Sequence, residues 1–321
     1  MNGVESTLRL LEIGVPQGSI LGPLLFILFI NDLPKITNFN VKLFADDTFL
    51  SLASNDLKTL QNKTNAELKK INRWFSANKL TLNITKSKYM IIKRNNKKNF
   101  LDFSLKFNGK KMEECNSYKY LGVHLDDKLN WKKHIKYLCE KLSKMCGLFA
   151  KLRHCCNIYL LKTIYHALVE SHLQYCNMIW GNADRRILEP YVKLQNKLIR
   201  IICFIAKDDN IDIEQFYKNV GVLKLVQLNK LTTAKFMYKY KNCLLPNDNF
   251  VNFFKTSSSN QRYPLRNRRN QDFQCEWGKS NFAMKKLQYA GVQIWNSILP
   301  EIRNVNSLRE FKTKFKRFLV T

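Results

Sequence analysis

The 321-residue sequence is short of acidic side chains. It holds 25 Asp and Glu residues against 54 Lys and Arg residues, so the net charge is +29 at pH 7. The basic excess is spread along most of the chain rather than confined to one tail. A surface of this kind repels itself unless an anion is near, and nucleic acid is the commonest such partner. Anionic membrane is the alternative partner.

The sequence also lacks a run of apolar residues long enough to span a membrane. The only long run, residues 20–30, is well short of the roughly 20 residues that a spanning helix needs. No cationic segment precedes it and no small-residue cleavage site follows it, so it is not a signal peptide. We therefore expect a soluble intracellular protein with no membrane partner. The sequence does not distinguish nucleus from cytoplasm.

Pairs of Cys-x₂-Cys knuckles, a nuclease signature and internal repeats are missing too, although the chain has nine cysteines. Several of the cysteines lie within helical patterns, which predicts reduced thiols packed in a core. One zinc site is left open, because a His and a Cys at positions 172 and 176 share a helix face. Its candidate ligands are His154, Cys155, Cys156, His172 and Cys176.

The sequence does contain two adjacent carboxylates between short β-prone segments. In residues 41–50, Val-Lys-Leu-Phe-Ala-Asp-Asp-Thr-Phe-Leu, the pattern predicts two strands meeting at an acidic turn. Neighbouring side chains of an extended chain point to opposite faces, so Asp46 and Asp47 need a tight turn to approach one site. Paired carboxylates suit Mg²⁺ holding a substrate phosphate. An ordinary exposed acidic turn is the alternative.

A glycine-rich bend precedes this acidic turn. Residues 14–19 (Gly-Val-Pro-Gln-Gly-Ser) force a bent backbone, and Ser19 can cap a helix over residues 20–30. Because that helix is apolar nearly all round, we expect it to be buried in a core. The open glycine surface beside Gln17 is suited to lie under a base pair or a sugar ring. A purely structural turn is the alternative.

Helical and strand patterns alternate after the acidic turn. Residues 56–78 predict an amphipathic helix from apolar side chains at steps of three and four. Short strands are expected at residues 89–92, at residues 103–107 before an Asn108-Gly109 turn, and at residues 118–123.

The rest of the chain is predicted to be helical. Helices are expected at residues 131–153 with Asn130 as cap, at 158–175, and at 189–204 with Pro190 in the first turn. Together they imply a helical bundle. The first of them carries Lys132, Lys133 and Lys136 among its polar positions. Such side chains suit phosphate contacts without sequence preference, and a merely solvated face is the alternative.

A boundary is expected near residues 207–209, followed by further helices at 223–243, 282–298 and 308–319. The last has the Ser307 and Glu310 spacing of a capping box. Three phenylalanines of that helix are expected to face inward, namely Phe311, Phe315 and Phe318. Residues 256–270 are polar and unpatterned, which predicts a flexible basic loop. Its arginines either grip RNA or belong to a disordered segment, namely Arg266, Arg268 and Arg269.

Four segments, in order, resemble a known family. Residues 14–34, with Gly-Val-Pro-Gln-Gly-Ser at their start and Ile-Asn-Asp-Leu-Pro at their end, resemble the template-gripping motif of reverse transcriptases from jockey-like non-LTR retrotransposons. Residues 44–47 (Phe-Ala-Asp-Asp) resemble the catalytic box of this family, and residues 80–86 resemble the motif that follows it. Residues 120–135 resemble the passage from palm to thumb. The resemblance covers residues 1 to about 135 and continues more loosely near 175–181 and 291–300.

The resemblance implies RNA-templated DNA synthesis, in which a primer 3′-hydroxyl attacks the α-phosphate of a deoxynucleotide with two Mg²⁺ ions clamping the oxygens. It implies that Asp46 is the direct metal ligand and Asp47 its partner. Lys86 is a candidate general acid for the departing pyrophosphate, or else a phosphate contact or a solvated lysine. The implied partners are an RNA template, a DNA primer and deoxynucleotides. The residues implied to contact nucleotide or template are Gln17, Gly18, Ser19, Phe44 and Ala45.

The expected fold is α+β, with a partial reverse-transcriptase palm of short antiparallel sheet and helices, followed by a helical thumb and a helical carboxyl-terminal region. We place the palm at residues 1–128, the thumb-like region at 129–207 and the basic helical region at 208–321.

The family pattern has a third metal-binding carboxylate on a strand before residue 14, where this sequence offers only Glu5 and Glu12. We therefore expect an amino-terminally truncated polymerase whose site an upstream polymerase segment or another chain would complete. Alone it is expected to polymerise very weakly or not at all, because misplaced metals can cost on the order of a hundredfold in rate. The alternative is a non-catalytic nucleic-acid-binding remnant.

Overall fold

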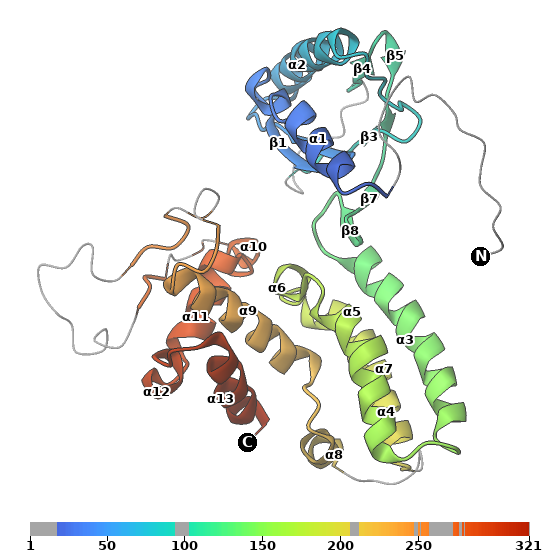
Figure 1. Ribbon diagram of the computed structural model, residues 1–321, viewed down its shortest axis with the longest axis vertical. Coiled ribbons are helices and arrows are strands. Elements are labelled where there is room, and N and C mark those ends of the chain that lie inside the picture. The colour runs from blue at the N-terminus through green and yellow to red at the C-terminus, as the bar shows by residue number, and fades with distance from the viewer. Residues whose placement is uncertain are drawn as a thin grey trace, which may run out of the picture. The chain divides into compact units, whose positions relative to one another are not determined.

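The computed structural model describes residues 18–93, 103–205, 212–246, 250, 252–256, 272–275, 278 and 280–320. The chain forms two compact units, Met1–Tyr118 and Lys119–Thr321, called unit 1 and unit 2 below. Unit 1 combines helices with short strands, and unit 2 is almost entirely helical (Figure 1). The mixture of helices and short strands confirms the coarse α+β prediction.

Unit 1 begins with the apolar helix α1 (Leu21–Ile30), followed by the 3-10 turn η1 (Leu33–Lys35). The hydroxyl of Ser19 accepts a hydrogen bond of 3.1 Å from the backbone N–H of Gly22, as the predicted cap requires. The predicted burial of this helix is wrong. Only Gly22 and Ile30 are buried, because the described core of unit 1 covers just the end of α1. The exposed side chains include Leu21, Leu24, Leu25, Ile27, Leu28 and Phe29.

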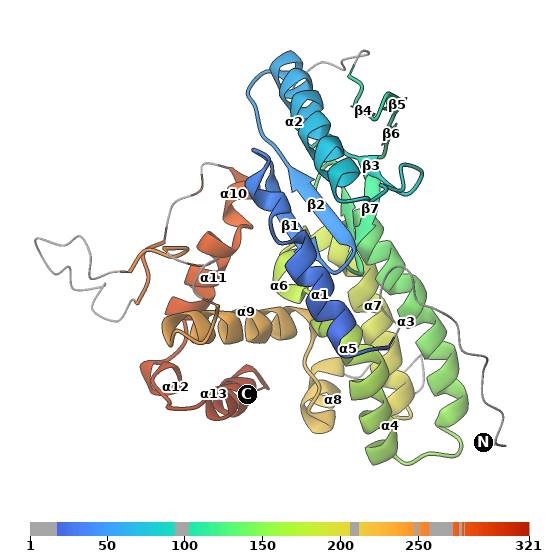
Figure 2. The ribbon, with the colours of Figure 1, turned by 45° about the horizontal axis from the view of Figure 1, so that its top comes forward.

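A two-stranded antiparallel hairpin follows, formed by β1 (Asn40–Phe44) and β2 (Asp47–Ser51). Phe44 pairs with Asp47 across the hairpin, which leaves two residues in the turn. The inward-facing positions alternate along both strands, as expected for a sheet with one covered face. Figure 2 shows the two strands running beside each other in unit 1. The prediction of two short strands meeting at the acidic pair is confirmed.

Helix α2 (Leu57–Ala77) covers the hairpin residues of the unit 1 core. Asp56 caps it, because its Oδ2 accepts a hydrogen bond of 2.7 Å from the N–H of Thr59. The helix buries one apolar stripe and exposes its lysines, so the predicted amphipathic helix is confirmed. The buried apolar residues of the core are Ile30, Leu33, Phe39, Leu68, Ile71, Trp74, Leu105, Phe107 and Met112.

The remaining strands are short. They are β3 (Lys88–Tyr89), β4 (Lys106–Phe107), β5 (Lys110–Lys111), β6 (Glu113–Glu114), β7 (Ser117–Tyr120) and β8 (Val123–Asp126). β3 pairs in parallel with β6, and β4 pairs antiparallel with β5. The predicted Asn108-Gly109 turn is confirmed, with φ angles of 48° and 75°. The strand predicted at residues 118–123 is confirmed as far as Tyr120, but its continuation is wrong, because Leu121 and Gly122 turn the chain between β7 and β8.

Unit 2 opens with a helical bundle. Its elements are α3 (Lys132–Leu152), α4 (Ile158–Tyr165), the π-helical turn η2 (His166–Glu170), α5 (Ser171–Gln174), α6 (Asn177–Trp180) and α7 (Arg185–Ile202). α3 packs along α7, and α4 contacts α7 as well (Figure 1). Phe149, Tyr165 and Leu198 are fully buried between them. The prediction of three successive packed helices is confirmed.

Two helix starts in the bundle differ from the prediction. The N–H of Lys132 donates to the Asn130 side chain at 3.0 Å, as predicted, but the buried carboxylate of Asp126 also accepts from the N–H of Trp131 at 2.8 Å. α3 therefore begins at Lys132 rather than Trp131. α7 begins at Arg185, so Pro190 lies inside the helix and the prediction that it occupies the first turn is wrong.

Further helices form the carboxyl-terminal region of unit 2. They are α8 (Ile213–Val220), α9 (Leu225–Lys241), α10 (Asn281–Met284), α11 (Leu287–Asn296), α12 (Pro300–Arg303) and α13 (Leu308–Val320). α9 contacts α5, α6, α11 and α13. The helices predicted at 223–243 and 308–319 are confirmed, whereas residues 282–298 form two helices instead of one. Phe311 and Phe315 are buried, but Phe318 is 44% exposed, so its predicted inward position is wrong.

Some predictions lie outside the described residues. The boundary at residues 207–209 and nearly all of the basic loop at 256–270 fall there, together with Arg266, Arg268 and Arg269. The three-region division at residues 128 and 207 stays a prediction. Across the described ranges, no helix combines the length and the apolar composition that crossing a bilayer requires.

Candidate functional site

The two adjacent carboxylates lie at the exposed turn of the β1–β2 hairpin. Ala45 and Asp46 form the turn, and Asp47 is the first residue of β2. Ala45 has a left-handed φ of 49°, a conformation that costs a residue with a side chain about 1–2 kcal/mol. Both aspartates are exposed to solvent. The tight turn that the two carboxylates need is therefore present.

The hairpin carboxylates have the oxygen donors that Mg²⁺ prefers, and within the described ranges neither forms an ion pair with a Lys or Arg side chain. However, the described part of the chain contains no group of three or more His, Cys, Asp or Glu residues that could hold a metal ion. The donor chemistry of the two carboxylates therefore fits Mg²⁺, and these two are the candidate ligands that the described residues offer at the turn.

The residues predicted to contact nucleotide lie in two segments of unit 1. Gly18 has a φ of +87°, and no atom lies within 4 Å of where a Cβ would stand. Ser19 binds the first turn of α1. Phe44 is 61% exposed at the end of β1, directly before Ala45. Gln17 lies outside the described residues.

Lys86, the predicted general acid, lies in a turn before β3. Its backbone N–H donates to the side-chain oxygen of Asn83 at 3.2 Å, and its side chain is exposed. No ion pair joins Lys86 to Asp46 or Asp47 in the described structure. The role of Lys86 as a general acid stays a prediction.

The predicted basic positions of α3 are exposed, as phosphate contacts require; they are Lys132, Lys133 and Lys136. Sequence reasoning missed a cationic cluster beside them. The ammonium groups of Lys119 and Lys141 lie 5.5 Å and 4.8 Å from the centre of the Tyr137 ring. The Lys141 hydrogen bond is the main cause that lowers the pKa of Tyr137. The i, i+4 spacing of Tyr137 and Lys141 could have revealed half of this cluster.

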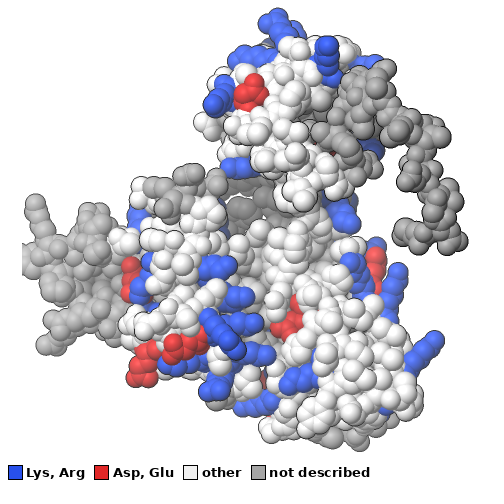
Figure 3. Space-filling view, viewed as in Figure 1, with Lys and Arg blue, Asp and Glu red and all other residues white. Residues whose placement is uncertain are grey.

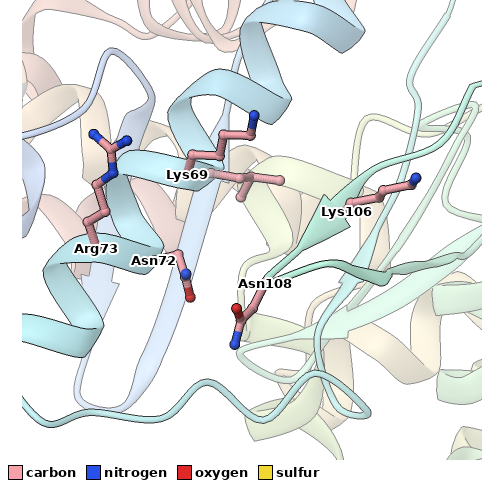
Figure 4. A pocket seen from close by; sticks show the side chains of 6 residues that line it. Lys69, Asn72, Arg73, Lys106 and Asn108 are labelled. Carbon is pink, nitrogen blue, oxygen red and sulfur yellow. The ribbon is translucent and has the colours of Figure 1, made fainter.

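A small basic pocket in unit 1 was also not predicted. It has a volume of about 150 Å³ and lies between α2 and the β4–β5 turn. Figure 4 shows the side chains of Asn72 and Asn108 facing each other across it, with three cationic side chains around them. The cations are Lys69, Arg73 and Lys106. Lys106 lies far along the sequence from Lys69 and Arg73, so local sequence patterns give no signal for the pocket.

The cysteines are all unpaired thiols. Burial raises the pKa of the Cys203 thiol to about 11 and also raises the pKa of Cys139 and Cys146. Reduced thiols are therefore favoured, as predicted. The zinc site considered from residues 154–156, 172 and 176 is not assembled in the described structure.

Comparison with known proteins places the hairpin in a family. Residues 1–125 match the family described as "Reverse transcriptase (RNA-dependent DNA polymerase)". The "RNA-directed DNA polymerase from mobile element jockey" of Drosophila melanogaster is 27% identical over 217 residues, covering 63% of this chain and 23% of the relative. Its counterpart in Drosophila funebris is 29% identical over 213 residues, with the same two coverages.

In sequence, the chain resembles jockey-like reverse transcriptases. The "Probable RNA-directed DNA polymerase from transposon X-element" of Drosophila melanogaster is a further relative, 27% identical over 205 residues, or 59% of this chain and 21% of the relative. The chain spans about a quarter of the length of the curated relatives it matches. No solved structure matches it significantly. The matched residues 1–125 include the whole β1–β2 hairpin.

Proposed function

We propose that this chain supplies part of the catalytic centre for RNA-templated DNA synthesis. One observation carries the proposal, namely that the hairpin turn presents Asp46 and Asp47 to solvent within the segment that matches reverse transcriptases. The hairpin is the kind of rigid element on which a metal-binding pair keeps its geometry. The substrates are a DNA primer on an RNA template and deoxynucleotides.

Asp46 and Asp47 would hold Mg²⁺, with Asp46 as the direct ligand and Asp47 as its partner. When bound, two such ions neutralise phosphate charge and orient the attacking and leaving oxygens. The chain's own residues do the rest of the binding. The open space at Gly18 allows a base or sugar to approach the backbone closely, and Gln17 and Ser19 flank it. The exposed ring of Phe44 and the turn residue Ala45 border the same carboxylates.

Lys86 would donate a proton to the departing pyrophosphate, an acid role that an amine near developing negative charge can perform. We further propose that residues 1–128 are the palm, 129–207 the thumb and 208–321 a basic carboxyl-terminal region. On the thumb, exposed lysines of α3 would contact phosphates without reading sequence. These are Lys132, Lys133 and Lys136.

The test is primer extension on an RNA template with Mg²⁺ and deoxynucleotides, comparing the wild-type chain with Asp46→Asn and Asp47→Asn. Asp184→Asn serves as the control, because Asp184 is an exposed carboxylate in unit 2 that pairs with Lys285 at 3.2 Å. Mn²⁺ binding, measured by electron paramagnetic resonance, gives a second readout that does not depend on turnover. We expect Asp46→Asn and Asp47→Asn, but not Asp184→Asn, to weaken Mn²⁺ binding by about tenfold or more and to abolish whatever weak extension the wild-type chain supports. Equal Mn²⁺ binding by wild type and Asp46→Asn would overturn the proposal.

A non-catalytic nucleic-acid-binding role is the second candidate. The observation that favours it is the absence of a third metal-binding side chain near the hairpin in the described ranges, beside strongly basic helices. Under this alternative the chain shows no extension, yet binds RNA in a salt-sensitive way that Asp46→Asn leaves unchanged. Extension abolished by Asp46→Asn would exclude it.

A further inference from the structure

A basic groove runs between the end of α8 and one face of α13. It has a volume of about 1000 Å³. Five of its eight lining residues are cationic and none is acidic. The lining residues are Lys218, Gly221, Arg309, Lys312, Thr313, Lys316, Arg317 and Val320. Figure 3 shows Lys and Arg side chains gathered over the part of unit 2 where Figure 1 places α9 and α13.

The residues of α13 that line the groove lie on a different face of the helix from the residues that pack in the core. Arg309, Lys312 and Lys316 follow one another at steps of three and four, so they form one stripe along the helix. A different stripe of the helix holds Phe311 and Phe315, whose rings stack 5.8 Å apart and are buried in the unit 2 core. Because these two phenylalanines are packed in the core, α13 is held in a rotation that leaves the cationic stripe lining the groove.

Acidic side chains close to the groove are paired elsewhere. Glu310 accepts from Lys314 at 2.9 Å on another face of α13, and Glu214 of α8 pairs with Lys224. The positive charges of neighbouring lysines in unit 2 repel one another, and this repulsion affects the pKa of one of them. The pKa of Lys235 on α9 is lowered, first by burial and then by the positive charges of Lys312 and Lys239. Within the described residues, no carboxylate forms an ion pair with Arg309, Lys312 or Lys316 of the stripe, which favours binding of an anion there.

We propose that the α8–α13 groove binds the sugar-phosphate backbone of a nucleic acid strand, independently of base sequence. The lining contains no aromatic side chain on which a base could stack, so the affinity must come from phosphate contacts. From Arg309 to Lys316 the stripe is about 10 Å long at 1.5 Å per residue, which spans about three phosphates at 3.4 Å of axial rise per strand. This role does not depend on the proposed polymerase chemistry in unit 1.

The test compares two double variants that remove the same charge from unit 2. Lys312→Gln with Lys316→Gln changes the groove stripe. Lys193→Gln with Lys314→Gln is the matched control, since these lysines pair with Glu189 and Glu310 outside the groove and such exposed pairs contribute little stability. Glutamine keeps a high helix propensity at all four positions, and circular dichroism checks that each variant folds.

Binding of a fluorescein-labelled 20-nucleotide polyuridylate is measured by anisotropy from 50 to 200 mM KCl, with the full chain. We expect the groove variant to bind about tenfold more weakly than wild type at 100 mM KCl, and its salt slope to be smaller by about 1.4, or 0.7 for each lost phosphate contact. The control variant should stay within about twofold of wild type. A random-sequence RNA and a DNA duplex should show the same loss in the groove variant.

Equal weakening by the two double variants would assign the effect to net charge and overturn the proposal, as would unchanged binding by the groove variant. A groove variant that loses binding to phosphatidylserine vesicles but keeps its RNA affinity would overturn it in favour of a membrane surface. This test reads RNA binding alone, whereas the hairpin proposal is tested by primer extension and Mn²⁺ binding. A negative extension experiment therefore does not contradict the groove proposal, and unchanged RNA binding by the groove variant does not contradict the hairpin proposal.

Discussion

The indole N–H of Trp74 donates a hydrogen bond of 3.1 Å to Oδ2 of Asp32. Trp74 lies in α2 and Asp32 follows α1 directly, so the bond joins two elements that are 42 residues apart. The β1–β2 hairpin lies between them in the sequence. The contact therefore holds together the two helical segments that flank the candidate metal-binding turn.

Trp74→Phe should lower the free energy of unfolding of unit 1 by about 2 kcal/mol, because it removes a buried hydrogen bond and part of a packed side chain. Trp74 is 8% exposed and its ring packs edge-on against Phe75. Urea unfolding followed by circular dichroism measures the loss. Asp32→Asn is the control, since its side-chain oxygen can still accept the indole bond and should preserve most of the stability. A Trp74→Phe variant as stable as wild type would show that the contact contributes nothing.

Glu67→Gln should make unit 1 less stable at neutral pH. The carboxylate of Glu67 accepts hydrogen bonds from Lys70 Nζ at 2.7 Å, the Asn38 N–H at 2.8 Å and the Thr37 hydroxyl at 2.9 Å. These bonds, that of Lys70 first, lower the pKa of Glu67 from 4.5 to about 2. A lowered carboxyl pKa stabilises the folded state above the unfolded pKa, and the contribution is lost as the pH falls from 4.5 toward 2.

We expect Glu67→Gln to cost about 2 kcal/mol at pH 7, and the difference from wild type to shrink below pH 4.5. Urea titrations at pH 7, 4.5 and 3 measure this dependence. Glu189→Gln is the control, because Glu189 is half exposed and pairs only with Lys193 of its own helix. A cost of Glu67→Gln that is the same at all three pH values would contradict the assignment.

Gly122→Ala should destabilise the turn between β7 and β8 more than Gly109→Ala destabilises the turn between β4 and β5. Both glycines have a left-handed φ, +83° and +75°, so each alanine adds about 1 kcal/mol of backbone strain. Only at Gly122 would the new Cβ also crowd a ring, 3.3 Å from Cε1 of Tyr175. The Tyr175 hydroxyl is held by donating to the carbonyl of Leu121 at 2.5 Å.

Urea unfolding of the two variants should therefore show a larger loss for Gly122→Ala by about 1 kcal/mol, because overpacking of a fixed ring adds to the strain. Combining Gly122→Ala with Tyr175→Ala tests the cause, since removal of the ring should cancel the extra cost. An extra cost that persists without the ring would place its origin elsewhere.

Acid should destabilise unit 2 through His134. Burial, and secondarily the charge of His124, lowers the pKa of His134 from 6.5 to about 4. Its ring lies against Trp180 and Tyr137, and its Nδ1 accepts a bond of 3.4 Å from the N–H of His124. With a folded pKa below the unfolded pKa, the unfolded state binds the proton first. Stability is thus complete above pH 6.5 and declines as the pH falls toward 4.

The expected decline between pH 7 and pH 4.5 is about 2 kcal/mol. Urea unfolding at these two pH values measures it, and a proton NMR titration of the His134 ring measures the pKa directly. His134→Phe removes the titrating group and should flatten the stability profile over this range. A His134 ring that titrates near 6.5 in the folded protein would contradict the prediction.

The parts of the fold that the sequence predicts are those whose signals are local. The spacing of Leu68 and Ile71 within residues 56–78 and the capping side chain of Asp56 define α2. The β-prone residues on either side of Asp46 and Asp47 define the hairpin, and the family motif names the same two residues. These signals need only a few neighbouring residues.

Predictions that depend on distant contacts were less successful. The apolar composition of α1 predicts a helix correctly, but it does not tell which elements cover that helix. Leu121 and Gly122 are read as strand interior because the residues around them are β-prone, whereas the pairing of β7 with β8 makes them a turn. The groove joins Lys218 to residues more than 90 positions later, and no local pattern can reveal it.

The exposure of α1 has a consequence for hydrogen exchange. Its ten residues are fewer than the roughly 12–15 that an isolated helix needs to persist in water, and only Gly22 and Ile30 are buried. Local opening of α1 should therefore require little free energy, whereas α2 is anchored by the core of unit 1. Amide deuterons should enter α1 within a short labelling pulse, while the buried turns of α2 retain their protons for much longer.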